Sequence, residues 1–348
     1  MGDIGTRIAT ESSAVDFHIW PQNLAQATLI TILKAALPNS APIYNRILAP
    51  HNTPTQHCLF AASIPSSTIS CYLPEIYTVI FADRSHNEAQ IWLHSSRHAE
   101  GKPVTSELKR QIQQHVSSAF HFIRNAKIPN CPGWPFSPNI LFYRMQTEVA
   151  DVLRALLDPY QAVEWDTNWG RFNIPLSNLP AIPTLPGGLH YVSPVPEGQY
   201  DIVLSTSAIK RQKKVLMSLP SSSILDSRGK AVAWAFCGAD ASLSTLYVVD
   251  AWRKKGLAKA VAADLLHKVR NEYEFPNLAE KYDAEIWKRE RVGERKPFGR
   301  GSGIVFAEIK VGNTASERTM EWLGGRKAGL SRYVLVDTSK VPAGADVE

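Results

Sequence analysis

Cysteine pairs and long apolar runs are both missing from this 348-residue sequence. Its four cysteines, at positions 58, 71, 131 and 237, lie far apart and form no Cys-x-x-Cys pair. This spacing argues against a disulfide scaffold and a zinc ribbon, and it suits a reducing compartment. The sequence has no run of 18 apolar residues, and its N-terminus lacks the apolar core of a signal peptide. We therefore expect a cytoplasmic protein with no membrane-spanning segment.

A strong excess of charge of one sign is missing too. The 38 Lys and Arg residues against 32 Asp and Glu residues give a net charge of +6. That excess falls short of a nucleic-acid-binding footprint but suits an anionic cofactor held at one site. The sequence also lacks a P-loop, Gly-x-Gly-x-x-Gly, His-Glu-x-x-His and Gly-x-Ser-x-Gly. His115 and His121 are not at the spacing of a helical metal pair, so we expect no metal.

The length corresponds to about two domains, and hydrophobic periodicity gives both halves the same order: helix, three strands, helix, strand, helix, strand. In the first half these are residues 25–37, 58–64, 77–82, 90–94, 106–124, 140–144, 147–157 and 162–165. In the second half they are residues 200–207, 223–225, 231–237, 243–249, 257–273, 304–311, 315–323 and 333–336, after a strand at 189–192. Both a duplication of one fold and a chance likeness of two α+β domains remain open.

Proline and glycine concentrate between residues 172 and 196, where neither a helix nor a central strand is expected. We therefore predict an N-terminal domain over 1–172, a linker over 173–188 and a C-terminal domain over 189–348. An insertion at 271–303 is expected either as a solvated loop or as a substrate lid or basic rim.

The segment with the clearest chemical meaning is Leu246–Ala258. A strand is followed by a short basic loop that turns at Gly256, and a strongly amphipathic helix starts directly afterwards. Free N–H groups and the helix dipole at such a start favour a phosphate or pyrophosphate. Glycine allows the close approach that a side chain would block.

This segment resembles the Arg/Gln-x-x-Gly-x-Gly/Ala signature of the GCN5-related N-acetyltransferase (GNAT) superfamily, through Arg253, Gly256 and Ala258. Downstream, Asn313–Ser316 and Leu323–Gly325 resemble the second motif of that superfamily, although an ordinary helix cap and helix stop would look the same. The whole chain resembles the glycine N-acyltransferase-like branch, in which a degenerate copy of the fold precedes the catalytic domain. The equivalent turn of the first half, Ser96–Gly101, lacks the signature.

The resemblance implies an α+β fold with a mixed, mostly antiparallel twisted sheet and flanking helices, here as a tandem whose first copy is degenerate. It implies that acetyl-CoA or another acyl-CoA lies between the strands at 243–249 and 304–311. Its pantetheine would pair with the backbone of Tyr247, Val248 and Val249, and an N–H near Val248 would stabilise the oxyanion. The implied pyrophosphate contacts are the backbone N–H groups of Arg253, Lys254, Lys255, Gly256, Leu257 and Ala258. Asn313 and Ser316 would contact the cofactor from the other side.

The proton-transfer groups are less clear, because this chain departs from the superfamily pattern. The position where many relatives carry a Glu is Ser242, and Asp240 and Glu308 are the other candidate bases. Asp240 would point to the same side as Ser242 on an extended strand, or it is a solvated turn residue. The usual acid position is Met320, which cannot donate a proton, and Tyr247 or Tyr333 would have to replace it.

We therefore expect an acyl-CoA-dependent N-acyltransferase that acts on a small-molecule amine such as an amino acid, as a monomer or homodimer and without metal, nucleic acid or membrane partners. A protein N-acetyltransferase is the first alternative. A CoA-binding protein without catalytic activity, or one recruited to another biosynthetic reaction, is the second.

Overall fold

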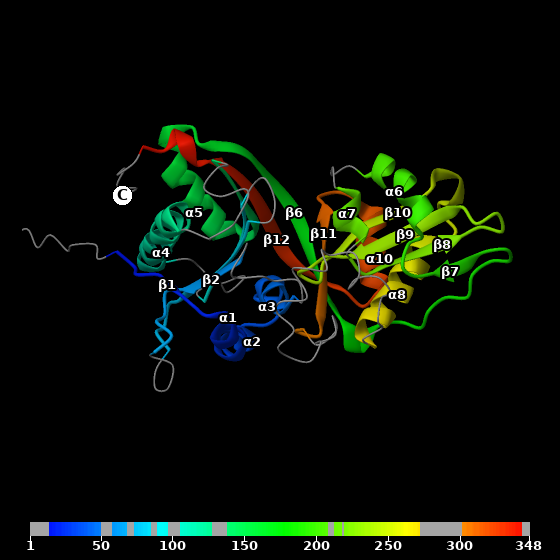
Figure 1. Cartoon of the computed structure of the whole chain (residues 1–348), viewed down its shortest axis with the longest axis horizontal. Coiled ribbons are helices and arrows are strands. Elements are labelled where there is room, and N and C mark those ends of the chain that lie inside the picture. The colour runs from blue at the N-terminus through cyan, green and yellow to red at the C-terminus, as the bar shows by residue number, and fades with distance from the viewer. Residues whose placement is uncertain are drawn as a thin grey trace, which may run out of the picture. The chain divides into compact units, whose positions relative to one another are not determined.

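The computed structural model describes most of the chain. Its described residues are 14–49, 58–67, 73–84, 89–96, 105–126, 138–207, 212–217, 219–271 and 301–342. Most of the insertion predicted at 271–303, and most of the turn at 96–101, lie outside this description. The chain forms two compact units (Figure 1). Unit 1 comprises residues 1–21, 55–165 and 334–348, and unit 2 comprises residues 22–54 and 166–333.

The predicted domains were continuous stretches of sequence, whereas the compact units are not. Residues 22–54 pack within unit 2, and residues 334–348 pack within unit 1. Two long strands, β6 (Val163–Pro175) and β12 (Arg326–Asp337), begin in one unit and end in the other. β6 also enters the predicted linker, because Phe172 and Ile174 alternate with polar residues and are buried before Pro175 ends the strand.

Unit 1 is a sheet with two helices packed on one face. Its strands, in spatial order, are β1 (His18–Ile19), β2 (Cys58–Ala62), β3 (Thr78–Asp83), β4 (Ala89–Ser95) and β5 (Asn139–Gln146). All pairs among these strands are antiparallel except β4 with β5, which is parallel. Helices α4 (Ser106–Asn125) and α5 (Thr147–Leu157) bury their apolar faces in this unit's core.

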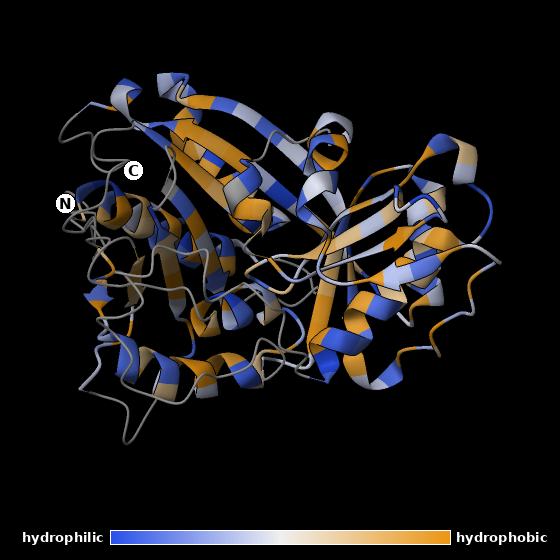
Figure 2. Cartoon of the chain, turned by 45° about the vertical axis from the view of Figure 1, so that its right-hand side comes forward, coloured by the Kyte–Doolittle hydropathy of each residue, from blue (hydrophilic) through white to orange (hydrophobic). Residues whose placement is uncertain are grey.

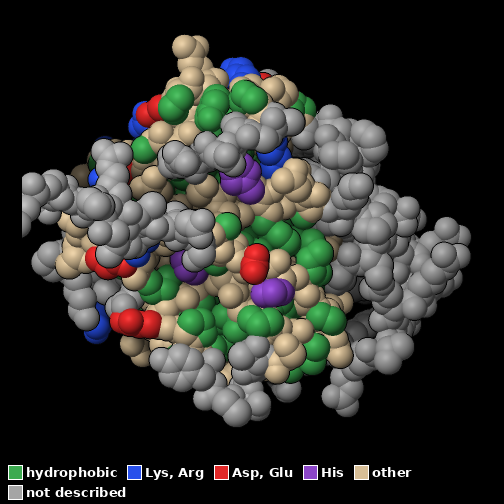
Figure 3. Space-filling view, turned by 90° about the vertical axis from the view of Figure 1, so that its left-hand side faces the viewer, with side chains coloured by type: hydrophobic (Ala, Val, Ile, Leu, Met, Phe, Trp, Pro, Cys, Tyr) green, Lys and Arg blue, Asp and Glu red, His purple; other side chains and the backbone are tan. Residues whose placement is uncertain are grey.

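One row of aromatic side chains crosses unit 1 through directly paired residues of β2, β3, β4 and β5. Phe60, Phe81, Trp92 and Tyr143 follow one another at ring-centroid distances of 5.2, 5.7 and 4.9 Å. These contacts fix the register of the four strands. In Figure 3, which views the molecule from the side of this unit, hydrophobic side chains gather in the middle with histidines among them, and the visible Lys and Arg side chains stand at separate places.

Unit 2 contains a four-stranded antiparallel sheet in the order β10 (Leu243–Val248), β9 (Ala231–Cys237), β8 (Ser221–Leu225) and β7 (His190–Val192). It also contains β11 (Ile304–Lys310), which pairs antiparallel with β6. Its other helices are α1 (Gln22–Leu24), α2 (Ile30–Ala35), α3 (Ala41–Leu48), α6 (Tyr200–Thr206), α7 (Lys213–Met217), α8 (Leu257–Arg270) and α10 (Thr314–Trp322), with a π-helical turn at Ala25–Leu29.

Helices cover both faces of the four-stranded sheet, which explains why every residue of β9 is buried. Ala233 and Ala235 face the core that contains α8, while Trp234 and Phe236 face the core that contains α6 and α7. Figure 2 shows the matching pattern, with apolar residues on one side of the helices and along the strands. The mixed α+β architecture with flanking helices confirms the expected fold class. Helix α3 was not predicted; Pro42 lies in its first turn, where proline is tolerated.

Candidate active site

The loop before α8 has the geometry expected of an anion-binding turn. A 3₁₀ turn at Asp250–Trp252 follows β10, and Lys254 and Gly256 both have left-handed backbones, with φ of 63° and 79°. Gly256 is the N-cap of α8, and no side chain caps the helix there. The N–H of Ala260 is bonded to the Gly256 carbonyl at 3.1 Å. Within the described chain, no hydrogen-bond acceptor is recorded for the N–H groups of residues 256–258. A helix start without a cap is a ready site for an anion.

The three basic side chains of this loop differ in their surroundings. The Arg253 guanidinium folds back over Tyr247, forms an ion pair with Asp250 at 2.7 Å, and donates from Nε to the Val248 carbonyl at 3.2 Å. The Lys255 ammonium lies 4.5 Å from the centre of the Trp252 ring. All three side chains are exposed, so Lys254 and Lys255 add positive charge at the helix start.

Beside this loop lies the feature that we call the fork, formed by β10 and β11. The two strands are joined by one parallel bridge, Ser242 to Phe306, with the Phe306 N–H bonded to the Ala241 carbonyl at 3.3 Å. Beyond that bridge they belong to separate sheets. A bulge between Ser244 and Tyr247 bends β10. The strands are thus joined at one end, and β10 leads directly into the Gly256 loop at the other.

Val248 presents its backbone toward the free edge of β10. The next residue, Val249, donates its N–H to the Val232 carbonyl of β9 at 2.9 Å. Because neighbouring residues of a strand direct their backbone groups to opposite edges, the N–H and carbonyl of Val248 point away from β9. The bond from Arg253 to the Val248 carbonyl agrees with this orientation. An N–H at this edge is available to a group that lies along β10.

Asp240 and Ser242 build the closed end of the fork. β10 begins only at Leu243, so Asp240 lies in the preceding turn and is not on an extended strand. Its carboxylate accepts the Ser242 N–H at 3.1 Å, and both residues are buried. The turn is tight, since the Gly238 N–H is bonded to the Ser242 carbonyl at 2.7 Å. The geometry therefore gives both residues a role in holding the turn.

Glu308 has a different environment, on the face of β11 that points away from α8. Val305, Ala307 and Ile309 pack in the core with α8, so Glu308 lies on the opposite face. The Tyr333 hydroxyl donates to the Glu308 carboxylate, and Trp169 lies edge-on to the Tyr333 ring with centroids 6.3 Å apart. The structure thus joins one candidate base with one candidate acid.

The second motif adopts the ordinary helix-cap geometry. The Asn313 side chain accepts the Ser316 N–H at 3.2 Å and caps α10. Gly324 follows the helix with φ of 82°. Met320 is buried in the core, so the usual acid position serves packing in this chain. Contacts of Asn313 and Ser316 with a cofactor stay predictions.

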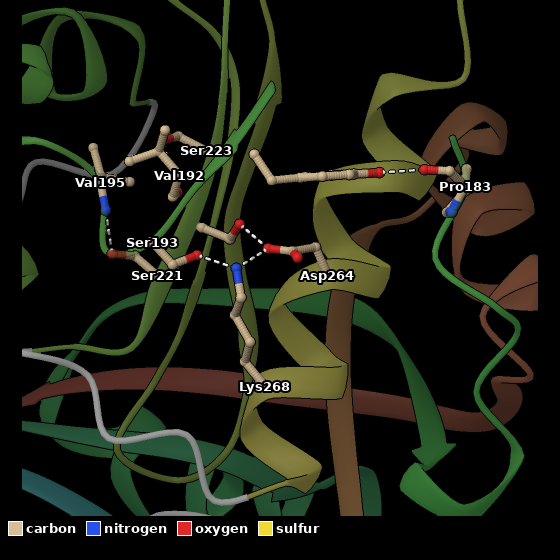
Figure 4. Close-up of polar contacts among 10 residues, drawn as sticks. Pro183, Val192, Ser193, Val195, Ser221, Ser223, Asp264 and Lys268 are labelled. Carbon is tan, nitrogen blue, oxygen red and sulfur yellow. Dashed lines mark hydrogen bonds and ion pairs between the residues drawn. The ribbon is translucent and has the colours of Figure 1, made fainter. Parts of the chain in front are cut away.

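A buried polar network anchors α8 to the sheet behind it. Lys268 donates to Asp264 at 2.6 Å and to Ser193 at 2.7 Å, and Ser222 of β8 also donates to Asp264. Figure 4 shows the Lys268 ammonium between Asp264 and Ser193. Burial and the Asp264 charge raise the pKa of Tyr191 to about 12. The network fixes how far α8 is rotated and displaced on the sheet, and hence where its first turn lies.

Cys237 is fully buried, and burial, followed by the nearby Asp240 charge, raises the pKa of its thiol, which keeps it protonated. Cys237 is therefore a packing residue of the core of unit 2. In the described part of the chain, no cluster of three metal-ligating side chains is found, and no helix there is both long and apolar enough to span a bilayer.

Comparison with known proteins agrees with the fold. Residues 16–176 match the family described as the acyl-CoA N-acyltransferase verG N-terminal domain. A Drosophila protein of solved structure is similar over 94% of this chain and 99% of its own length, with a TM-score of 0.59 and 13% identity. A tandem GNAT protein from the clavulanic acid biosynthesis pathway is similar over 94% of this chain and 99% of its own length, with a TM-score of 0.45 and 11% identity. A GCN5-related N-acetyltransferase from Kribbella flavida is similar over 77% of this chain and 87% of its own length, with a TM-score of 0.41 and 12% identity. No curated protein sequence matches the chain.

The family match is to a domain of an acyl-CoA N-acyltransferase, and it covers residues 16–176 of this chain. The matched family agrees with the resemblance to acyl-CoA-dependent N-acyltransferases, and the fold is similar to that of the Drosophila protein.

Proposed function

We propose that this chain transfers an acyl group, acetyl in the simplest case, from acyl-CoA directly to the amine of a small molecule. The observation that carries the proposal is the fork, whose β10 arm runs straight into an uncapped, positively charged helix start. An extended cofactor with a pyrophosphate at one end and a thioester at the other matches that arrangement. In this proposal the N–H groups of residues 256–258 hold the pyrophosphate, and the free edge of β10 holds the pantetheine.

Val248 is the proposed oxyanion donor, because its N–H lies at the free edge of β10. When bound, acyl-CoA supplies the thioester carbonyl that the amine attacks. A preorganised donor of this kind contributes about 3–4 kcal/mol to the transition state. The bulge in β10 bends the strand near this position, which is a common device for aiming a group at an active site.

Glu308 and Tyr333 are the proposed proton-transfer pair, since they are already hydrogen-bonded to each other. As the new C–N bond forms and the C–S bond breaks, Glu308 accepts the proton that the amine loses. Tyr333 gives its proton to the departing thiolate and regains one from Glu308 through their shared hydrogen bond. The pair thus returns to its starting state, and no proton is gained or lost.

The test is a calorimetric titration of acetyl-CoA into the wild-type chain, followed by an assay of thiol release with a panel of small primary amines, amino acids included. Micromolar binding together with amine-dependent thiol release supports the proposal. Binding without release on any amine contradicts the transfer step and favours the CoA-binding alternative. The absence of binding refutes the proposal as a whole.

A further inference from the structure

Asn45, on α3, reaches the closed end of the fork from between 195 and 259 residues away in sequence. Its side-chain Nδ2 donates to the Ile304 carbonyl at 3.1 Å and to the Asp240 carbonyl at 3.3 Å. Its Oδ1 accepts the Ser302 N–H at 2.9 Å. One amide therefore bonds both the turn that precedes β10 and the start of β11.

Asn45 and Asp240 are buried in these contacts, and Ser302 and Ile304 are half-buried. Asn45 is 5% exposed and Asp240 4% exposed. A Cβ atom built on Gly301 would lie 2.5 Å from the Asn45 Oδ1, so a larger residue at position 301 would clash with the Asn45 side chain as it stands. Backbone groups withdrawn from water without partners are costly, and here one buried side-chain amide bonds three backbone groups.

At the closed end of the fork, side chains of β10 and β11 share one core, but among the described residues their backbones meet at one place. A single bridge, Ser242 to Phe306, joins the two strands, because they otherwise belong to different sheets. The Asn45 amide forms a second connection between the turn that precedes β10 and the start of β11. The separation of the two strands just beyond the bridge consequently depends on this amide.

We propose that Asn45 is a positioning residue for acyl transfer, which sets the spacing of β10 and β11 where the thioester end of acyl-CoA lies. This inference rests on the proposed function. It also gives the N-terminal segment a part in the site, although that segment lies outside the stretch that carries the motifs.

The position of Asn45 predicts which end of acyl-CoA binds differently when the Asn45 amide is removed. From Ser242 to the end of β10 the chain covers about 20 Å at roughly 3.3 Å per residue. The Gly256 loop therefore lies far from the Asn45 contacts. Removing the amide should disturb the thioester end and leave the phosphate end unchanged.

The experiment compares two ligands on the full chain. Acetyl-CoA reaches along the whole fork, whereas adenosine 3′,5′-bisphosphate reaches only the phosphate loop. For Asn45→Ala we expect the Kd of acetyl-CoA to rise about tenfold and that of adenosine 3′,5′-bisphosphate to change less than twofold. Equal weakening of both ligands, or no change in either, overturns the inference. Asn45→Asp keeps the shape and the bond from Ser302 but loses the two donated bonds, so it gives the same test if the alanine variant folds poorly.

Gln26→Ala is the matched control, because the Gln26 amide donates to the Ile47 carbonyl at 3.4 Å within the same N-terminal segment of unit 2. It should leave both dissociation constants unchanged. Hydrogen exchange of the ligand-free protein tests the connection separately from the proposed function. The amides of Ser302 and Phe306 should exchange at least tenfold faster in Asn45→Ala and at the wild-type rate in Gln26→Ala. If wild type fails to bind acetyl-CoA, the proposed function fails, and unchanged exchange in Asn45→Ala shows that the connection itself is absent.

Discussion

Replacing Gly256 by alanine tests the central feature of the site, the left-handed helix start. Gly256 has φ of 79°, and a Cβ atom built there meets nothing within 4 Å. Alanine therefore introduces no clash, and its cost is the backbone strain of a left-handed residue, about 1–2 kcal/mol of unfolding free energy. The added methyl group would also hinder a pyrophosphate from reaching the backbone N–H groups of residues 256–258. We expect the affinity for acetyl-CoA to fall at least tenfold, which is about 1.4 kcal/mol.

Gly229 supplies a control with the same backbone penalty. It has φ of 74° in the turn between β8 and β9, and its Cβ position is open too. Gly229→Ala should lower the free energy of unfolding as much as Gly256→Ala, measured by urea denaturation, and leave the acetyl-CoA affinity unchanged. Calorimetry on the two variants then separates strain from binding. Equal affinities in the two variants would refute the assignment of the loop.

The remaining predictions concern buried or paired polar groups. Lys268→Met leaves the Asp264 carboxylate buried without its cation and should lower the free energy of unfolding by about 3 kcal/mol. Adding Asp264→Asn should recover most of that lost free energy. A urea midpoint of Lys268→Met that stays at the wild-type value would contradict this prediction. Glu308→Gln should lower kcat by about 10²–10⁴-fold, and Tyr333→Phe should lower it less, with the acetyl-CoA Kd unchanged in both; an unaltered kcat would remove Glu308 from the reaction. Burial lowers the pKa of His115, so the unfolded state takes up a proton first as the pH falls. The stability that neutral His115 contributes is therefore complete above pH about 6.5 and decreases below it, and His115→Gln should flatten that acid limb in thermal melts from pH 5 to 7.5.

Much of the local structure could be predicted from the sequence, because periodicity and turn chemistry act over a few residues. The apolar face of α8 lies where its three- and four-residue spacing predicted, with Val261, Leu265 and Leu266 fully buried. The strand, basic loop and helix around Gly256 follow in the expected order. α4 and β9 have bounds within a residue or so of those predicted.

The arrangement of distant segments could not be predicted in the same way. The sequence left open whether Asp240 lies on an extended strand or in a solvated turn, and the structure places it in the turn that starts at Gly238, where it is buried. β6 runs on to Pro175, past the predicted start of the linker, where its continuation pairs with β11. Such pairings depend on which strand edges meet after the chain has folded, and a single sequence does not record that choice.

The sequence by itself determined the loop that can hold an anion and the helix that begins there, since glycine, spacing and apolar periodicity are local properties. Only the tertiary structure decided that Tyr333 donates to Glu308 and that Asn45 bonds Ile304, a residue 259 positions away. Each of these contacts exists because packing brings buried polar groups together and burial requires each to find a partner. The residues proposed to bind the cofactor are therefore visible in the sequence, whereas those proposed to set its geometry become visible only in the fold.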